Sequence, residues 1–262
     1  MNADDLKQLT TDALDRLAAL LDTGHSDQLT ALLKTMGRFH HYSFNNICLI
    51  TSQCPTATRV AGFHTWRALG RCVRKGEKGI GILAPIVRRR VDACDDDAKH
   101  VAGFRAAHVF DVTQTDGDPL PEPSMATGDP GVRTAQLRDA ILSHAIAIKA
   151  SDDLGGALGT STGGRIQLLT GLAPAEEFVV LVHEFAHELL HRSADRPASR
   201  DTRELEAEAV AFVVGDAVGL DVSQSSRDYI HLYRGDREAL ASSLDRIRRA
   251  AATILGAVEP IG

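Results

Sequence analysis

The amino-acid sequence predicts an α+β protein with two domains. Apolar residues recur at helical spacing in several long segments, and shorter apolar runs bounded by Gly or Pro are typical of strands. Both halves of the chain contain both kinds of segment, and α+β is therefore the expected class. Between them, DGDPLPEPSMATGDPG (116–131) is rich in proline and has no periodicity. We expect a domain over 1–115, a linker over 116–131 and a second domain over 132–262.

In the N-terminal half, residues 4–22 place six leucines on one helical stripe behind an acidic start, which predicts a helix. Ser43 is expected to cap the third helix. The same patterns predict, in order, helices at 26–38 and 43–53, a short helix around Trp66, a strand at 80–87, an acidic hairpin loop at 92–100 and a strand at 101–112.

In the C-terminal half, VRTAQLRDAILSHAIAIKA (132–150) is expected to be a helix that runs into a strand. GGRIQLL (163–169) reads as a short strand. The three remaining helices are expected at 176–193, at 203–219 with a terminal glycine cap, and at 237–255.

The composition is ordinary for a globular protein, with 44% hydrophobic and 24% charged residues in 262. The net charge of −6 argues against a wholly basic nucleic-acid binder, although it can hide local patches. MNADDLKQLT lacks the features of a secretory signal, and no apolar run reaches the length of a membrane span. The four cysteines match no metal-binding spacing. We expect a cytoplasmic protein without membrane segments.

The stretch HEFAHELLH (183–191) carries three histidines and two glutamates. Residues four apart share one face of a helix, so His183 and His187 can direct two imidazoles at one ion. Glu184 lies beside them as a carboxylate that could take a proton from metal-bound water. His191 shares this face, but ligands at i, i+4 and i+8 span roughly 12 Å, too far for one ion with bonds of about 2 Å. His191 is therefore expected to support the ligands or to lie at the surface.

A third ligand must come from another segment, because Leu190 and Ser193 occupy the positions of an extended HExxHxxGxxH motif. RELEAEAVAF (203–212) offers three glutamates. Glu204 and Glu208 share a helical face, whereas Glu206 points away and is expected to face solvent. We predict Glu204 as the third zinc ligand and Glu208 as the carboxylate that orients a ligand histidine, and the reverse assignment stays open.

Nine Lys and Arg residues against one acid, Glu77, give residues 59–90 a local charge of +8. Concentrated positive charge suits a phosphate backbone, and neighbouring aromatic rings suit base stacking. Phe44, Phe63 and Trp66 could equally be core residues. The predicted nucleic-acid-binding residues are Tyr42, Arg59, His64, Trp66, Arg67, Arg71, Arg74, Lys75 and Lys78.

Two family resemblances follow from these residues. HEFAH, followed about twenty residues later by ELEAE (204–208), resembles the glutamate-zincin metallopeptidases of the ImmA/IrrE type. The segments YSFNN (42–46), QCPTATRVAGFHTW (53–66), GRCVRKGEKGIGILAPI (70–86) and VFDVTQTDGDPLP (109–121) resemble the single-stranded-DNA-binding domain of ArdC-like antirestriction proteins. The resemblances imply a single-stranded-DNA-binding domain fused to a zincin-like domain, in a protein linked to mobile elements and to protection from restriction.

The expected activity is zinc-dependent hydrolysis of a peptide bond in a DNA-associated protein. Zn²⁺ held by His183, His187 and Glu204 would polarise a water, and Glu184 would accept its proton. Tyr229 is the first candidate for stabilising the oxyanion, with His231 and Tyr233 behind it. GGRIQLL is either an edge strand that aligns the peptide or a core strand. Two alternatives remain: a non-catalytic single-stranded-DNA shield with structural zinc, and a protease that regulates a transcriptional repressor.

Overall fold

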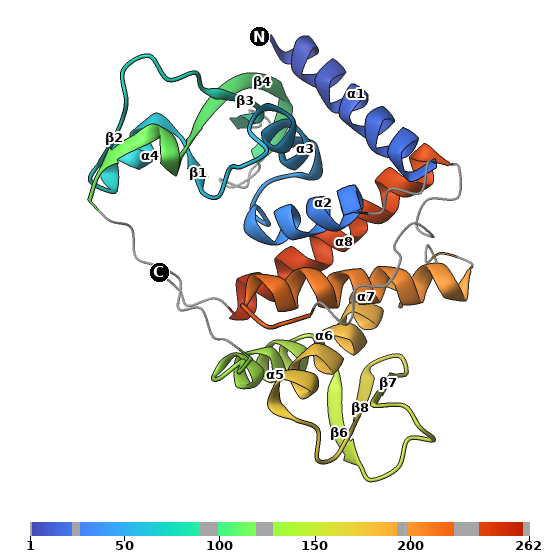
Figure 1. Cartoon of the computed structure of the whole chain (residues 1–262). Coiled ribbons are helices and arrows are strands. Elements are labelled where there is room, and N and C mark those ends of the chain that lie inside the picture. Colours follow the sequence, from blue (N-terminus) through green and yellow to red (C-terminus); the bar gives the residue numbers. More distant parts are fainter. Residues whose placement is uncertain are drawn as a thin grey trace. The chain divides into compact units, whose positions relative to one another are not determined.

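A computed structural model describes residues 2–22, 27–89, 99–118, 128–192, 197, 199–222 and 236–258. The chain divides into two compact units (Figure 1). Unit 1 comprises Met1–Arg16 and Tyr42–Glu122, and unit 2 comprises Leu17–His41 and Pro123–Gly262. Both units contain helices and strands, so the α+β class is confirmed.

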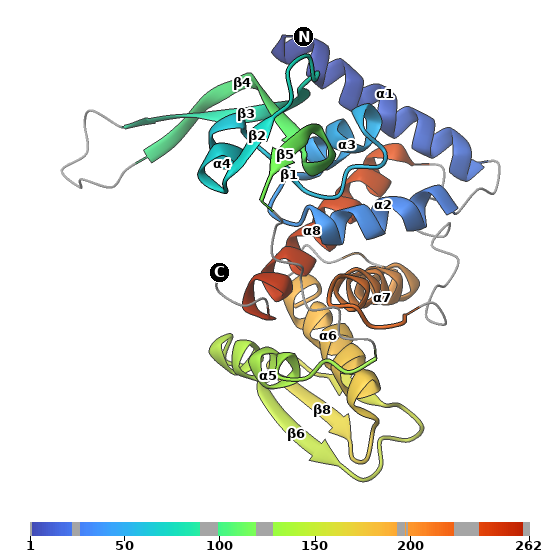
Figure 2. The ribbon, with the colours of Figure 1, turned by 60° about the vertical axis from the view of Figure 1, so that its left-hand side comes forward.

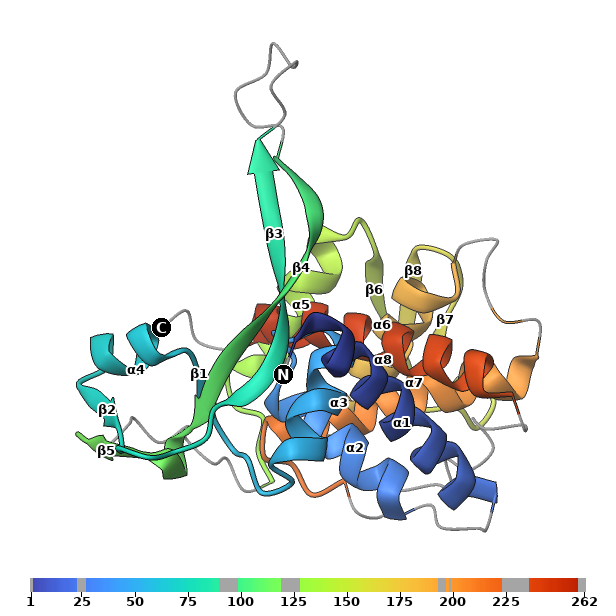
Figure 3. The same ribbon diagram turned by 90° about the horizontal axis from the view of Figure 1, so that it is seen from above.

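Unit 1 is built around an antiparallel hairpin of β3 (Ile80–Arg89) and β4 (Lys99–Asp111). The short β1 (Val60–Ala61) pairs with the other edge of β4, which gives the order β1-β4-β3. A second pair joins β2 (Arg71–Val73) to β5 (Thr115–Gly117). Figure 3 shows β3 and β4 as a long twisted ribbon. The predicted acidic loop at its tip falls largely outside the described residues.

Helix α3 (Phe44–Gln53) is fastened to β3 by two amide side chains. The Asn46 amide donates to Leu83 O at 2.9 Å and accepts from Leu83 N at 2.8 Å. The Gln53 amide forms the same pair of bonds with Gly81, both at 2.9 Å. Each amide thus satisfies strand groups that would otherwise lack partners. Leu6 of α1 (Ala3–Asp22), Leu49 and Leu83 fill the space between these elements.

Local cues also shape the ends of elements in unit 1. Ser43 caps α3 by accepting from Asn46 N at 3.3 Å, as predicted. A short helix, α4 (Phe63–Ala68), surrounds Trp66. The 3₁₀ turn η1 (Val112–Gln114) follows β4 and begins with a capping box between Asp111 and Gln114.

Unit 2 is centred on α6 (Pro174–Leu190). A three-stranded sheet of β6 (Ala147–Ser151), β8 (Arg165–Leu169) and β7 (Gly159–Ser161) lies beside this helix, as Figure 2 shows for β6 and β8. β6 runs parallel to β8, whereas β7 runs antiparallel to it. The helices α5 (Arg133–Ser143), α7 (Arg200–Ala217) and α8 (Arg237–Val258) pack against α6. Phe178, Leu181 and Phe185 of α6 are fully buried among them.

The division of the chain differs from the predicted boundary at residue 115. Helix α2 (Asp27–Arg38) belongs to unit 2, because it packs on α7. Its residues Leu32, Leu33 and Met36 are buried. Gly37 permits a close approach, since a Cβ there would lie 3.0 Å from Val213 O. At the predicted linker (116–131), residues 116 and 117 pair with β2, and 119–127 lie outside the described residues. Within the described part of the chain, no helix is long and apolar enough to cross a membrane.

Candidate metal centre

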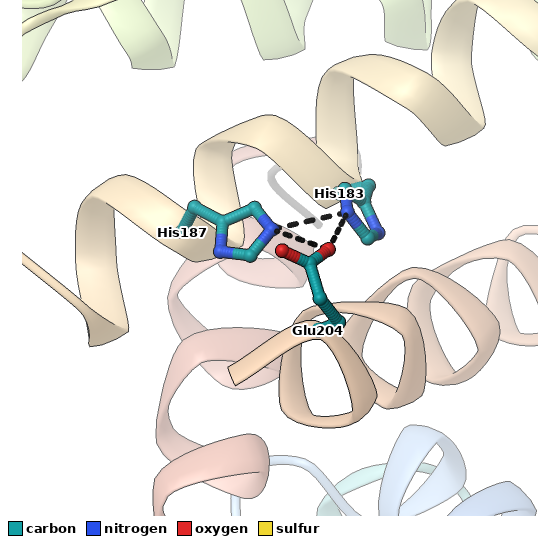
Figure 4. A group of neighbouring side chains, drawn as sticks. All are labelled: His183, His187 and Glu204. Atoms are coloured by element: carbon teal, nitrogen blue, oxygen red, sulfur yellow. Dashed lines mark hydrogen bonds and ion pairs between the residues drawn. The ribbon is translucent and has the colours of Figure 1, made fainter. Parts of the chain in front are cut away.

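Three of the predicted metal ligands come together between α6 and α7 (Figure 4). His183 and His187 lie one turn apart on α6, and their Nε2 atoms are 3.1 Å apart. Glu204, in the second turn of α7, places Oε2 at 3.6 Å from His183 Nε2 and 3.4 Å from His187 Nε2. Ser199 caps α7 through Thr202 N and so helps to set the start of the helix that carries Glu204.

The donor set fits a divalent cation. An ion with tetrahedral bonds of about 2.0–2.1 Å holds neighbouring ligand atoms about 3.3 Å apart. An octahedral ion with bonds of about 2.1 Å holds adjacent ligands about 3.0 Å apart. The three separations here lie between 3.1 and 3.6 Å. Two imidazoles and one carboxylate suit zinc and also manganese, so the geometry supports a metal site without selecting the metal.

The protonation states also favour a cation. Burial, and then the neighbouring His183, lower the pKa of His187 to about 4. A hydrogen bond with His183 lowers the pKa of Glu204 to about 2, although burial opposes the shift. Metal ligands must be neutral imidazoles and ionised carboxylates. At neutral pH, His187 and Glu204 already have these forms.

Glu184 is buried on α6 and faces the short strand β7. A Cβ at Gly159 would lie 2.6 Å from Val180 Cγ1 and 2.9 Å from Glu184 Cγ, so the glycine lets β7 press directly onto the helix. Burial raises the pKa of Glu184, while the charge of His183 and a hydrogen bond from Ser161 oppose the rise. A carboxylate with a raised pKa is a better proton acceptor than an ordinary one.

His191 and Glu206 form a buried group beside the ligands. His191 ends α6, and its Nδ1 lies 3.0 Å from Nδ1 of His187. Its Nε2 lies 3.0 Å from Glu206 Oε2. Ser243 Oγ and Arg246 Nε, both on α8, donate to Glu206 Oε1 at 2.6 and 3.2 Å.

The prediction that Glu206 faces solvent is therefore wrong. Its side chain is fully buried, because α8 packs on the face of α7 from which it projects. Burial alone would raise the pKa of Glu206, but its bonds to His191, Arg246 and Ser243 lower it overall. The spacing of glutamates within α7 correctly separated Glu206 from Glu204 and Glu208, but it carried no information about Ser243 and Arg246.

Glu208 and His191 line different cavities beside the candidate ligands. Glu208 lines a cavity of about 330 Å³ with His183, Glu184 and apolar side chains that include Val180 and Phe212. Its predicted role in orienting a ligand histidine stays a prediction.

A larger cavity, of about 620 Å³, opens directly beside the candidate ligands. Its walls come from β7, α6 and the start of α7, and three arginines (Arg192, Arg200 and Arg203) line it. Glu188, also in its lining, accepts from Gly164 N at 2.7 Å and so ties the turn between β7 and β8 to α6. The cavity is therefore bordered by the candidate metal ligands and by the residues of a short strand.

The strand GGRIQLL does not form the edge beside this cavity. Its residues Arg165–Leu169 form β8, which is the middle strand of the described sheet, paired on both sides. Of the two alternatives, the core strand is confirmed. β7 occupies the edge next to α6 instead. Its three residues, GTS, are too short and polar to give a strand pattern in the sequence. Tyr229, His231 and Tyr233 lie outside the described residues.

The predicted nucleic-acid contacts in unit 1 fall into different environments. His64, Arg67, Lys75 and Lys78 are exposed. Arg71 instead holds β5, donating to Thr115 Oγ1 at 2.8 Å and to Gly117 O at 3.2 Å. Arg74 pairs with Glu77 at 2.8 Å. Tyr42 is half-buried and donates to Val60 O at 3.2 Å, and Arg59 is also half-buried.

Trp66 is not available for stacking on a base in this structure, contrary to its predicted role. Its side chain is only 2% exposed, and its indole N–H donates to Phe110 O at 2.8 Å. The core alternative therefore holds for Trp66, and also for the buried Phe44. Among the described phenylalanines, Phe63 is 48% exposed and Phe104 on β4 is 55% exposed. Phe104 was missed because it lies outside the basic segment in the sequence.

Comparison with known proteins finds a family model that matches the N-terminal region, and a relative and solved structures that match nearly the whole chain. Residues 8–110 match the family model described as the N-terminal domain of anti-restriction factor ArdC. An uncharacterized protein of Bacillus anthracis, pXO2-81, is 24% identical over 307 aligned residues, which cover 97% of this chain and 52% of the relative. The chain thus spans about half the length of that relative.

Two crystal structures of the antirestriction ArdC protein from plasmid R388 share the fold at 18% identity. The metal-free structure has a TM-score of 0.52 and is covered over 97% of its chain by 95% of this one. The Mn(II)-bound structure has a TM-score of 0.55, and the alignment covers 99% of its chain and 97% of this one. The likeness in fold therefore extends beyond the N-terminal domain to nearly the whole chain.

Proposed function

We propose that this chain is an antirestriction protein that binds single-stranded DNA and carries a metal-dependent peptidase centre. The observation that carries the peptidase part is the triangle of His183, His187 and Glu204 beside the buried Glu184. The match of residues 8–110 and the ArdC-like fold support the antirestriction part.

Zinc was the metal expected from the sequence, whereas one of the similar ArdC structures contains Mn(II). The donor distances accept either ion. When bound, a divalent ion would supply Lewis acidity toward water and a peptide carbonyl. His183, His187 and Glu204 would hold it through two imidazole nitrogens and one carboxylate oxygen.

The remaining steps belong to the chain's own side chains and backbone. Glu184 would accept a proton at its carboxylate and later donate it to the leaving amine. β7 would align an extended peptide by strand addition along its outer edge. Gly159 keeps this strand against Glu184, so that an aligned peptide would lie near the proton acceptor.

In unit 1, DNA binding would rest on the exposed cations of the basic segment and on the exposed rings. The exposed His64, Arg67, Lys75 and Lys78 would contact phosphates, and the exposed Phe63 and Phe104 would contact bases. This assignment replaces Trp66 and Arg71, which hold unit 1 together. A protein bound to single-stranded DNA would be the natural class of peptidase substrate.

The variant Glu184→Gln tests the catalytic part, because it keeps the size of the side chain and removes the proton acceptor. We expect it to retain metal and DNA binding but to lose protection of unmodified incoming DNA in a host with a restriction system. The exposed Glu176→Gln on the same helix is the matched control and should protect as well as wild type. If Glu184→Gln protects fully, the protein acts as a non-catalytic DNA shield and the peptidase proposal is wrong.

A further inference from the structure

The ligand His187 uses both of its ring nitrogens. Nε2 faces His183 and Glu204, at 3.1 and 3.4 Å, and is the atom available to a metal. Nδ1, on the opposite side of the ring, lies 3.0 Å from Nδ1 of His191. Only one of these two facing Nδ1 atoms can carry the proton of the hydrogen bond. The group that contacts Nε2 of His191, on the other side of its ring, therefore determines which Nδ1 atom carries the proton.

That far side is occupied by a carboxylate. Nε2 of His191 lies 3.0 Å from Glu206 Oε2, and both side chains are buried. Ser243 and Arg246 donate to the other oxygen of Glu206, which keeps this carboxylate in place as an acceptor. A carboxylate that accepts from an imidazole requires an N–H on the facing nitrogen. A neutral His191 must then carry its proton on Nε2.

The position of each proton follows from the one before it, starting at Glu206 and proceeding through His191 to His187. With Nε2–H on His191, its Nδ1 has a lone pair and accepts from Nδ1–H of His187. With Nδ1–H on His187, its Nε2 presents a lone pair toward Glu204 and His183. This is the only arrangement of two neutral rings that satisfies both 3.0 Å contacts, and it is the one that a metal ligand needs.

We propose that His191 and Glu206 are positioning residues that fix the orientation and the Nδ1–H tautomer of His187. We call His187, His191 and Glu206 the relay. The proposal rests on the metal centre proposed above and assigns to Glu206, through His191, the orienting role that the sequence suggested for Glu208. It also connects the centre to α8, because Arg246 contacts both oxygens of Glu206 at the end of the relay.

A purely structural role for these residues predicts a different pattern. If Glu206 served only to join α7 to α8, the loss of any one hydrogen bond to it would have the same effect on metal affinity and on the tautomer of His187. Ser243→Ala removes one such bond, but Arg246 still contacts both oxygens of Glu206, so the relay stays intact. His191→Phe removes another bond, preserves a ring of similar size and interrupts the relay. His191→Asn keeps an acceptor near the position of Nδ1 while removing the ring.

The first measurement needs no metal. In the metal-free full-length protein with ¹⁵N-labelled histidine at pH 8, long-range ¹H–¹⁵N correlation identifies which nitrogen of His187 is protonated. We expect the Nδ1–H tautomer in wild type and in Ser243→Ala, and a mixture of tautomers in His191→Phe. An Nε2–H tautomer of His187 in the wild-type protein would overturn the proposal.

The second measurement is the affinity for Zn²⁺ and, separately, Mn²⁺, by competition with a chelating dye. Loss of a partner that orients a ligand typically weakens metal binding about 10–100-fold, and we expect this for His191→Phe. Ser243→Ala should bind as wild type, and His191→Asn should bind more tightly than His191→Phe. Equal affinities of wild type and His191→Phe would refute the relay. Absence of metal binding by wild type would instead refute the metal centre, and the tautomer measurement would still decide the relay.

Discussion

Asp111 shows how one buried carboxylate organises a junction in unit 1. It accepts from Thr58 N at 2.8 Å, Arg59 N at 3.1 Å and Thr113 N at 3.0 Å, and also from the Thr113 hydroxyl at 2.6 Å. Burial alone would raise the pKa of Asp111, but these donors lower it overall. The residue thereby joins the approach to β1, the end of β4 and the turn η1.

We expect Asp111→Asn to destabilise the protein by about 2–4 kcal/mol, because an amide cannot accept all four bonds and leaves buried donors unpaired. Urea denaturation measures the change in the free energy of unfolding. Asp116→Asn is the control, since this side chain is 73% exposed and should change stability by less than about 0.5 kcal/mol. Equal effects of the two variants would contradict the role given to Asp111.

The same carboxylate predicts a pH dependence. A lowered pKa in the folded state means that the stabilisation is complete above the ordinary Asp value of 3.8 and is lost as the pH falls through the lower folded value. The stability difference between wild type and Asp111→Asn should therefore be constant from pH 5 to about pH 8 and shrink below about pH 4. Denaturation curves across this range measure it, and a difference that grows toward low pH would have the wrong sign.

Residues of the candidate centre differ in how far the sequence could predict them. Helical spacing alone predicted that His183 and His187 share one face and that Glu204 and Glu208 share a face of a second helix, but it did not choose between the two glutamates. Glu206 was misjudged because its partners lie 37 and 40 residues away on α8. Trp66 was misjudged for the same reason, since the acceptor of its indole, Phe110 O, belongs to a distant strand.

At the scale of elements, the contact between β7 and α6 depends on a glycine. Gly159→Ala would bring a methyl group within 2.6 Å of Val180 and 2.9 Å of Glu184. We expect a loss of about 1–3 kcal/mol in stability, from crowding at a packed contact. Gly256→Ala in α8 makes the same substitution in open space and should stabilise by about 0.5–1 kcal/mol through helix propensity. Thermal denaturation distinguishes the two signs, and stabilisation by Gly159→Ala would disprove the close contact.

The basic segment around β2 and β3 predicts salt-dependent binding to single-stranded DNA. Replacing Lys75 and Lys78 with alanine should reduce the slope of log K against log salt by about 0.7 for each lost phosphate contact. Fluorescence anisotropy with labelled oligodeoxythymidine measures that slope. Lys7→Ala/Lys149→Ala makes the same change in net charge with exposed lysines elsewhere and should leave the slope unchanged. If both double variants lower the slope equally, the basic segment is not the binding site.

Phe104 provides the matching prediction for base stacking. Its ring is more than half exposed on β4, so Phe104→Ala should weaken binding by about 1–3 kcal/mol if one base stacks on it. The salt dependence should not change, because no charge is removed. A Phe104→Ala variant with wild-type affinity would exclude the ring as a stacking surface.

At the scale of the whole molecule, the α+β class was predictable from periodicity, whereas the division into units was not. The proline-rich stretch lies mostly outside the described residues. The segment from Leu17 to His41 belongs to unit 2, because the buried face of α2 and the small Gly37 suit packing on α7. An amphipathic helix indicates that one face is covered, but it does not identify the covering element.

Unit 2 contains the three candidate metal ligands His183, His187 and Glu204, beside the buried Glu184. Residues 8–110 match the ArdC N-terminal domain model, and the likeness in fold to the R388 ArdC structures covers nearly the whole chain. Catalysis and DNA binding remain separately testable, because the residues proposed for each belong to different units.

The most direct test of the metal centre is the metal content of the purified full-length protein after incubation with Zn²⁺ or Mn²⁺ and gel filtration, measured by mass spectrometry. We predict one ion per wild-type chain and about the same for Glu208→Gln. His183→Ala and Glu204→Gln should retain far less, since each removes one of three ligands. A wild-type protein without stoichiometric metal, or a His183→Ala variant that keeps its ion, would contradict the assignment.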